Sequence, residues 1–134
     1  MKIAGITFSL LLSFTLCSEN WIEIGANPEA TFFIDLESVN IKEDSVTIVK
    51  KGVYNNFLTE ILDGKSIVFN QTIGLIEMDC KLKVNRVIQI KMLNDKGDVV
   101  WSSGMMMRRQ WESVKKNSHA ESTFIKVCDN FHQT

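Results

Sequence analysis

Apolar and polar side chains alternate along the segment from Leu75 to Met92. Eight of its nine even-numbered positions are apolar, Arg86 being the exception, and most odd-numbered positions are polar or charged. A period of two is typical of a strand with one buried and one solvated face. Strands usually have about 5 to 6 residues, so we expect a bend, bulge or break near residues 83–86 that preserves the alternation. The chain must therefore build a half-buried sheet.

Shorter runs of β-branched and aromatic residues flank this segment and predict further strands. We expect them at residues 21–25, 31–35, 45–54, 65–72 and 98–103. Asn94 to Gly97 carry the residues of a hairpin turn between two antiparallel strands. Residues 55–63 have mixed patterning, which favours a loop with a helical turn.

The last part of the chain has a helical pattern instead. Ser118 and Glu121 match the S-x-x-E capping box that opens a helix. Behind them, Phe124, Cys128 and Phe131 recur at i, i+4 and i+7, which places Cys128 on the buried stripe of a helix of roughly three turns. The fold class is therefore α+β: an antiparallel sheet of about six strands with a C-terminal helix packed on one face.

The N-terminal residues predict export. Ile3 to Leu16 are uncharged and follow Lys2, and the chain turns polar at Ser18. This run is shorter than the roughly 20 residues of a membrane-spanning helix and has the parts of a secretory signal peptide. We expect residues 1–18 to be that signal and residues 19–134 to form one domain; an uncleaved anchor or a buried N-terminal helix is the alternative.

Cys17 leaves a second alternative, acylation as in a lipoprotein. Lipoprotein signals place Leu three residues before the cysteine and a small residue directly before it, whereas this chain has Phe14 and Leu16 there. We therefore expect a soluble exported protein, in the periplasm or at the outer-membrane surface, rather than one anchored through Cys17.

Removal of the signal leaves two cysteines, Cys80 and Cys128, in an oxidising compartment. Cys80 has the parity of the apolar sheet face and Cys128 lies on the helix stripe, so we expect a disulfide that tethers the helix to the sheet. Two buried free thiols are the alternative. His119 and His132 are too far apart in sequence for a zinc-knuckle pair, and we expect no metal and no cofactor.

Charge is unevenly distributed although the formal net charge is −1. Residues 19–80 hold 4 basic and 11 acidic side chains, and residues 81–116 hold 9 basic and 3 acidic ones. A basic face of this kind suits a sulfated glycan, phosphate groups or an acidic protein; ordinary cross-strand charge pairing is the alternative. The candidate binding residues are Lys81, Lys83, Lys91, Arg108, Arg109, Lys115 and Lys116.

Methionines and tryptophans surround the paired arginines of this region. Such soft apolar residues make adaptable binding surfaces, but they also fill cores and dimer seams. The candidate interface residues, which include a possible homodimer seam, are Trp101, Met105, Met106, Met107 and Trp111.

Enzymatic activity is not expected. The sequence contains no G-x-S-x-G, no H-E-x-x-H and no glycine-rich phosphate loop. Nucleic acid is not an expected partner, because the exported chain is slightly acidic and carries no nucleic-acid-binding motif.

A set of residues spread from about Trp21 to Cys128 also forms a recognisable pattern, in which no single motif is specific. These residues are Trp21, Ile24 and Gly25, Phe32 to Asp35 with Ser38, Ile76 to Cys80, Asp95 to Gly97 with Val99 and Val100, Trp111 with Val114, and Cys128. In their order and spacing they resemble the surface-adhesin protein E family of Gram-negative bacteria. The chain departs from the family pattern after Trp111, where prolines are usual, and between Tyr54 and Thr72.

The resemblance implies a sheet of about six antiparallel strands with a disulfide-tethered helix, and adhesion to host matrix or serum proteins. A periplasmic or envelope accessory protein with a structural role and no host ligand is the alternative function.

Overall fold

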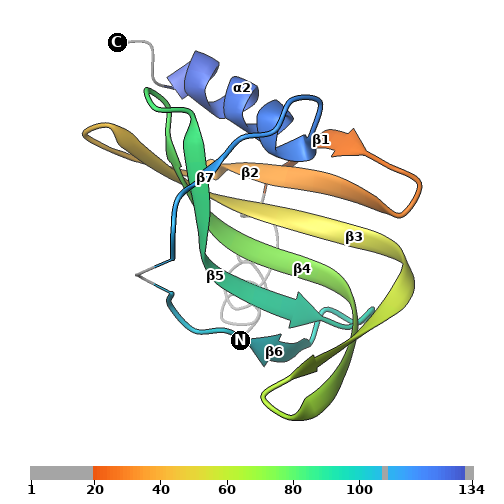
Figure 1. Cartoon of the computed structure of the whole chain (residues 1–134). Helices are drawn as coiled ribbons and strands as arrows, with labels where there is room; N and C mark the ends of the chain where they lie inside the picture. Colours follow the sequence, from red (N-terminus) through yellow and green to blue (C-terminus); the bar gives the residue numbers. More distant parts are fainter. Residues whose placement is uncertain (1–19, 107–108, 132–134) are drawn as a thin grey trace, which may run out of the picture.

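The computed structural model describes residues 20–106 and 109–131, without the side chains of Asn130 and Phe131. In this part of the chain one antiparallel sheet carries one helix (Figure 1). The elements are β1 (Trp21–Ala26), β2 (Ala30–Lys42), β3 (Ser45–Leu62), β4 (Lys65–Asp79), β5 (Val84–Leu93), β6 (Val99–Ser102), β7 (Glu112–Ser113) and α2 (His119–Phe131). The predicted signal peptide with Cys17, together with Met107, Arg108 and His132, lies outside the described residues.

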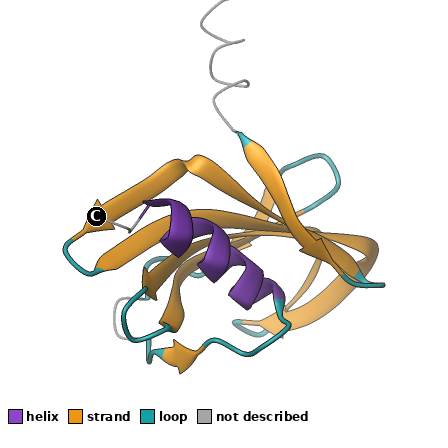
Figure 2. Ribbon diagram, turned by 90° about the horizontal axis from the view of Figure 1, so that it is seen from above, coloured by secondary structure: helices purple, strands orange, loops and turns teal. Residues whose placement is uncertain are grey.

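The sheet order follows the chain from β1 to β6, and the short β7 pairs with the start of β5. Consecutive antiparallel neighbours need only turns to connect them. Figure 1 shows the long middle strands curving strongly along their length, and Figure 2 shows α2 lying along one side of this curved sheet. The predicted α+β fold class, with about six antiparallel strands and a C-terminal helix, is confirmed.

Side chains on one face of the sheet, here called the core face, pack under α2. Val46 pairs with Met78 and Ile48 pairs with Ile76 across β3 and β4. Ile48 and Met78 are fully buried, as is Val127 from α2. The remaining buried members of this cluster are Ile34, Val46 and Phe124.

A capping box begins the helix, and a disulfide links the helix to the sheet. Ser118 Oγ accepts a hydrogen bond from the Glu121 backbone N–H at 3.2 Å, and Glu121 Oε1 accepts one from the Asn117 backbone N–H at 3.0 Å. The predicted capping box is thereby confirmed. Cys80 and Cys128 form the predicted disulfide, with their Cα atoms 5.7 Å apart.

The break expected between residues 83 and 86 is a tight turn over residues 80–83, so β4 and β5 form a hairpin. The expectation that the alternation is preserved across it is wrong. Met78 pairs with Asn85, and Ile76 pairs with Val87, so odd positions of β5 share the core face at first. A bulge opposite Leu75 and Ile76 then returns the even positions to that face. This shift explains why Arg86, the exception in the even series, points away from the core.

The helical turn expected within residues 55–63 is also wrong. β3 continues to Leu62 and pairs with β4 down to Lys65, after an irregularity between Val53 and Leu58. This end of β3 and β4 is a two-stranded ribbon whose apolar residues do not alternate cleanly, which hid it in the sequence.

The other edge of β5 is covered by the segment that follows it. Ser103 N–H donates to Ile90 O and Met106 N–H donates to Ile88 O, while β6 and β7 pair with the two ends of β5. Residues 99–113 thus run beside β5 and close an edge that would otherwise expose unpaired backbone groups. No helix in the described part of the chain is long and apolar enough to span a membrane.

Candidate functional site

A cavity of about 420 Å³ opens on the core face beyond the N-terminal end of α2. Its floor comes from β2, β3, β4 and β5, and its walls come from the first turn of α2 and from residues 109–115. This volume lies within the range of small-molecule sites in proteins. The sheet is therefore packed under α2 and open next to it.

Two glycines form the middle of the cavity floor. Gly52 on β3 and Gly74 on β4 are both buried, and both occupy core-face positions of the sheet. A Cβ at Gly52 would lie 3.0 Å from Thr72 Oγ1 and 3.3 Å from the Phe32 ring, while one at Gly74 would make only ordinary contacts. Thr72 and Phe32 therefore occupy the space beside Gly52, whereas the lack of a side chain at Gly74 leaves the floor unfilled there.

Lys50 also breaks the apolar series of the core face. It lies between Ile48 and Gly52 in the inward series of β3, and it pairs with Ile34 and Gly74 on the neighbouring strands. Its Nζ lies 2.6 Å from Nδ1 of His119, the first residue of α2, and 5.8 Å from the centre of the Phe32 ring. Among the described residues, no carboxylate forms an ion pair with Lys50.

Burial sets the ionisation of this pair. Removal from water lowers the pKa of Lys50 from 10.5 to about 8. Removal from water, followed by the Lys50 charge, lowers the pKa of His119 from 6.5 to about 4. His119 stays partly exposed, but one face of its ring stacks on Phe32, with the ring centres 3.8 Å apart. At pH 7 Lys50 is therefore a cation that donates to a neutral imidazole, whose proton sits on Nε2.

Further charged groups line the rim. Arg109 and Lys115 are exposed cations, and Glu112 is the one carboxylate among the described residues that line the cavity. Arg86 also borders the cavity, but its guanidinium is engaged by Glu77 at 2.7 Å and stacks on Trp111 at 4.3 Å.

The structure separates the predicted basic residues into distinct places. Lys81 and Lys83 lie on the turn between β4 and β5, whereas Lys91 lies on β5, so the three lysines do not form one basic face. Lys91 pairs with Ser102, on the face opposite Gly74 and Ile90. Arg108 falls outside the described residues.

Four of the predicted lysines do come together. The Val114 backbone N–H donates to Lys83 O at 3.4 Å, and Ser113 pairs with Val84, so the loop before α2 lies against the turn between β4 and β5. We call the resulting surface the basic end. Its exposed members are Lys81, Lys83, Lys115 and Lys116.

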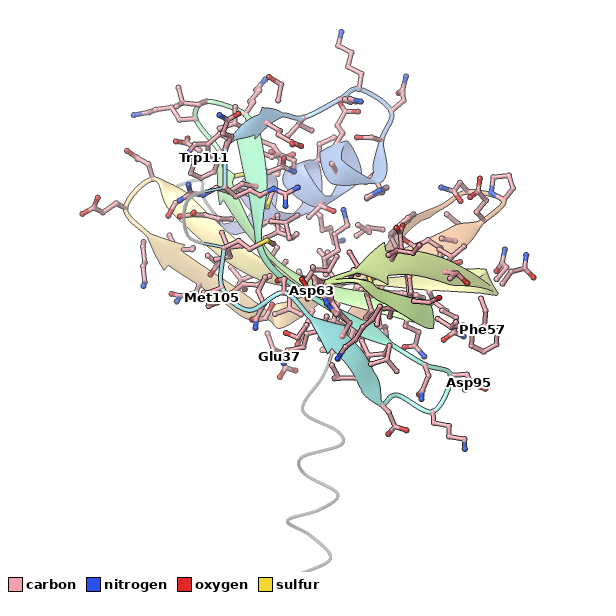
Figure 3. All side chains as sticks on the ribbon, turned by 60° about the horizontal axis from the view of Figure 1, so that its bottom comes forward. Glu37, Phe57, Asp63, Asp95, Met105 and Trp111 are labelled. Atoms are coloured by element: carbon pink, nitrogen blue, oxygen red, sulfur yellow. A yellow bond between two sulfur atoms is a disulfide. The ribbon has the colours of Figure 1, made fainter. Side chains whose placement is uncertain are left out.

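The predicted interface residues are not one cluster. Trp101 Nε1 donates to Asp63 Oδ2 at 3.0 Å, next to the β3–β4 ribbon, whereas Trp111 lies over Arg86 at the other end of β5. Met105 is 55% exposed, and Met106 contacts Arg109 through its sulfur. In Figure 3, Trp111 and Met105 lie on one side of the molecule and Phe57 on the other. Met107 lies outside the described residues.

An apolar surface that the sequence did not single out lies on the β3–β4 ribbon. Phe57, Ile61 and Val68 are each at least half exposed there. Because the ribbon extends past its neighbouring strands, nothing in the described chain covers these side chains.

The lysine at the centre of the cavity was also missed, although a signal for it exists. Val46, Ile48, Gly52 and Tyr54 define an inward series in which Lys50 is the one charged member. A charged residue inside such a series is a candidate functional residue, because sheets normally place charges on the wet face. From the sequence, we considered His119 only as a possible metal ligand. Residues 20–106 and 109–131 contain no group of three acidic, His or Cys side chains positioned to hold a metal ion.

Comparison with known proteins agrees with this architecture. A search of curated proteins finds no match. The model of the surface-adhesin protein E family matches residues 21–129, which is most of the chain and includes the whole sheet and both disulfide cysteines. The chain therefore belongs to the surface-adhesin protein E family.

Proposed function

We propose that this chain is an exported, non-enzymatic adhesin that binds sulfated host glycans through the basic end. Membership of a surface-adhesin family supports an adhesin-like function. The observation that carries the choice of ligand is the gathering of four exposed lysines from two segments far apart in the sequence. In the described chain, none of the four forms an ion pair with a carboxylate.

Unpaired surface lysines suit a polyanion better than an internal structural role. Cross-strand pairing was the alternative explanation for the uneven charge, and the one salt bridge found in the described residues is Arg86 with Glu77. Several like charges on one surface raise the local potential and attract a ligand of opposite charge, and added salt screens this attraction. Binding through the basic end is therefore expected to weaken steeply as salt rises.

Retention of the purified domain on a heparin column tests this proposal. The Lys83→Glu/Lys116→Glu variant reverses one charge on each segment of the basic end and is expected to elute at clearly lower salt. The matched control is Lys65→Glu/Lys96→Glu, which makes the same change in net charge at two exposed positions elsewhere, the start of β4 and the turn after β5. Equal losses in the two variants would mean that only net charge matters and would contradict a glycan site at the basic end.

The cellular location needs its own experiment. We propose display at the outer-membrane surface, for which protease added to intact cells should degrade the protein. Protection until the outer membrane is opened would favour the alternative, a periplasmic accessory protein without a host ligand.

The N-terminus bears on the same question. We propose that residues 1–18 are removed as a signal peptide. An intact mass that begins at residue 18 or 19 is the expected result. A mass that begins at Cys17 with added acyl chains would instead show a lipoprotein.

A further inference from the structure

The cavity over Gly52 and Gly74 calls for an explanation that the basic end does not supply. It lies on the core face of the sheet, and of the four lysines of the basic end only Lys115 borders it. The cavity of about 420 Å³ is open to solvent and has charged side chains at its floor and rim. Its combination of apolar walls with a few charged groups is typical of a small-molecule site.

The composition of the floor argues for a ligand rather than for loose packing. Glycine within a strand weakens it and often marks a place where a ligand approaches the backbone. Here two such glycines lie on the adjacent central strands β3 and β4, beside a lysine that also occupies a core-face position. Gly74 and Lys50 lower the stability of the folded chain, and together with Gly52 they line one space.

The charges specify the sign of the ligand. Among the charged residues of the lining, Arg86 is occupied by Glu77. The others are three cations, Lys50, Arg109 and Lys115, and one carboxylate, Glu112. Buried charges are normally paired, yet the described partner of Lys50 is the neutral ring of His119 at 2.6 Å. An anionic group that entered the cavity would supply the missing counter-charge.

The apolar part of the lining indicates that the ligand also has an apolar body. Tyr54, Ile76, Val87 and Ile90 border the same space as Lys50. Small-molecule sites combine such apolar walls with a few polar groups that fix orientation. An inorganic anion would leave these walls without a partner, whereas an anion with an aromatic or aliphatic body would contact them.

We propose that this cavity binds a small organic anion, with Lys50 holding the anionic group and with Tyr54 and Ile90 contacting the apolar body. Arg109 and Lys115 stand at the rim, where they attract the anion. Gly74 leaves the floor open for it. This activity is separate from glycan binding at the basic end, and either can fail without the other.

Two fluorescent probes test the proposal on the folded domain. 8-Anilinonaphthalene-1-sulfonate carries an aromatic body and a sulfonate, and N-phenyl-1-naphthylamine has a similar body without the charge. We expect Lys50→Gln to weaken binding of the sulfonate probe about tenfold, the loss of one charge-assisted hydrogen bond. Binding of the uncharged probe should be unchanged. We also expect the wild-type affinity for the sulfonate to fall as pH rises through about 8, where Lys50 loses its proton.

The matched control is Lys51→Gln, one residue further along the same strand. Lys51 lies on the opposite face of the sheet, with its Nζ 4.4 Å from the centre of the Trp21 ring. Binding of both probes should be unaffected. An equal loss of sulfonate binding in the Lys50 and Lys51 variants would overturn the proposal, as would an affinity that does not change with pH.

Two further variants locate the probe. Gly74→Val places a side chain on the cavity floor and should abolish binding of both probes. Phe57→Ser/Ile61→Ser removes exposed apolar side chains from the β3–β4 ribbon and should leave both affinities unchanged. Binding that survives in the first variant and disappears in the second would place the probe on the ribbon and would overturn the proposal.

Discussion

The two ends of the core face are built from the same strands but are filled differently. Under α2, Ile48 and Met78 are fully buried and the Cys80–Cys128 disulfide holds the helix in place. Beyond the first turn of α2, the same strands carry Lys50, Gly52 and Gly74 around an open cavity. Stability is therefore concentrated at the packed end, and the open end is left available for binding.

The largest expected effect comes from breaking the packed end. Cys80→Ser/Cys128→Ser removes a crosslink between residues 48 positions apart, and we expect the free energy of unfolding to fall by about 4 kcal/mol. Urea denaturation monitored by circular dichroism measures the loss. The variant should keep its affinity for the sulfonate probe at urea concentrations where it is folded; a loss of affinity in the folded variant would contradict the separation of the two ends.

The next largest effect is an increase in the free energy of unfolding, and it comes from a change at the open end. Lys50→Met removes a desolvated charge, and we expect the folded state at pH 7 to gain about 1 kcal/mol of stability, after the lost hydrogen bond to His119 is taken into account. Urea midpoints of the variant and of wild type measure the gain. A variant less stable than wild type would indicate that Lys50 serves the packing of the domain.

The stability that Lys50→Met gains should depend on pH, in a direction set by the lowered pKa of Lys50. The pKa of Lys50 is lower in the folded chain than its ordinary 10.5, so the unfolded chain holds the additional proton between pH 8 and 10.5. Wild-type stability therefore rises with pH across this window relative to that of Lys50→Met. The advantage of the variant should shrink between pH 8 and 10.5.

A smaller gain is expected from Gly74→Ala. A Cβ at this position meets the Gln89 carbonyl oxygen and the Ile76 side chain at 3.5 Å, which is ordinary contact. Alanine restricts the unfolded chain more than glycine does, so we expect about 0.5 kcal/mol of added stability. Gly52→Ala is the comparison, because its Cβ would approach Thr72 Oγ1 to 3.0 Å. Equal gains at the two positions would contradict the tighter packing around Gly52.

The last effect is on acid sensitivity. The pKa of His119 is lowered to about 4 in the folded chain, so between pH 6.5 and 4 the unfolded chain binds a proton that the folded chain does not. Stability is therefore lost as pH falls through this window. His119→Phe retains an aromatic ring for stacking on Phe32 and should lose less stability on acidification, measured as the change in urea midpoint between pH 7 and 4.5. An unchanged slope would contradict the low pKa of His119.

The packed end was largely predictable from sequence because its signals are local. The capping box at Ser118, the helical spacing of Phe124 and Cys128, and the parity of Cys80 each lie within a few residues, and together they predicted the helix, its packed face and the disulfide. The hairpin at residues 80–83 was foreseen as a break, but the β5 bulge was not, because its only marks in the sequence are the polar Arg86 at an even position and the adjacent apolar pair Val87 and Ile88.

The open end was not predictable because it depends on long-range contacts. Lys50 and His119 are 69 residues apart in sequence, and the capping box around His119 predicts a helix start but no contact with Lys50. Gly52 and Gly74 become neighbours of one cavity only through the pairing of β3 with β4. The lysines of the basic end were predicted as binding residues, but which of them lie together was not. The pairing of β7 with β5 brings Lys115 and Lys116 to Lys83 and leaves Lys91 elsewhere.

The most direct test of this division is the pKa of Lys50 itself, measured by NMR titration of the lysine side chains with Lys50→Gln to assign the signal. We predict a pKa of about 8 in the free domain and a higher value when the sulfonate probe is bound, because an anion stabilises the protonated amine. A pKa near the ordinary 10.5 that does not change on addition of the probe would contradict this prediction.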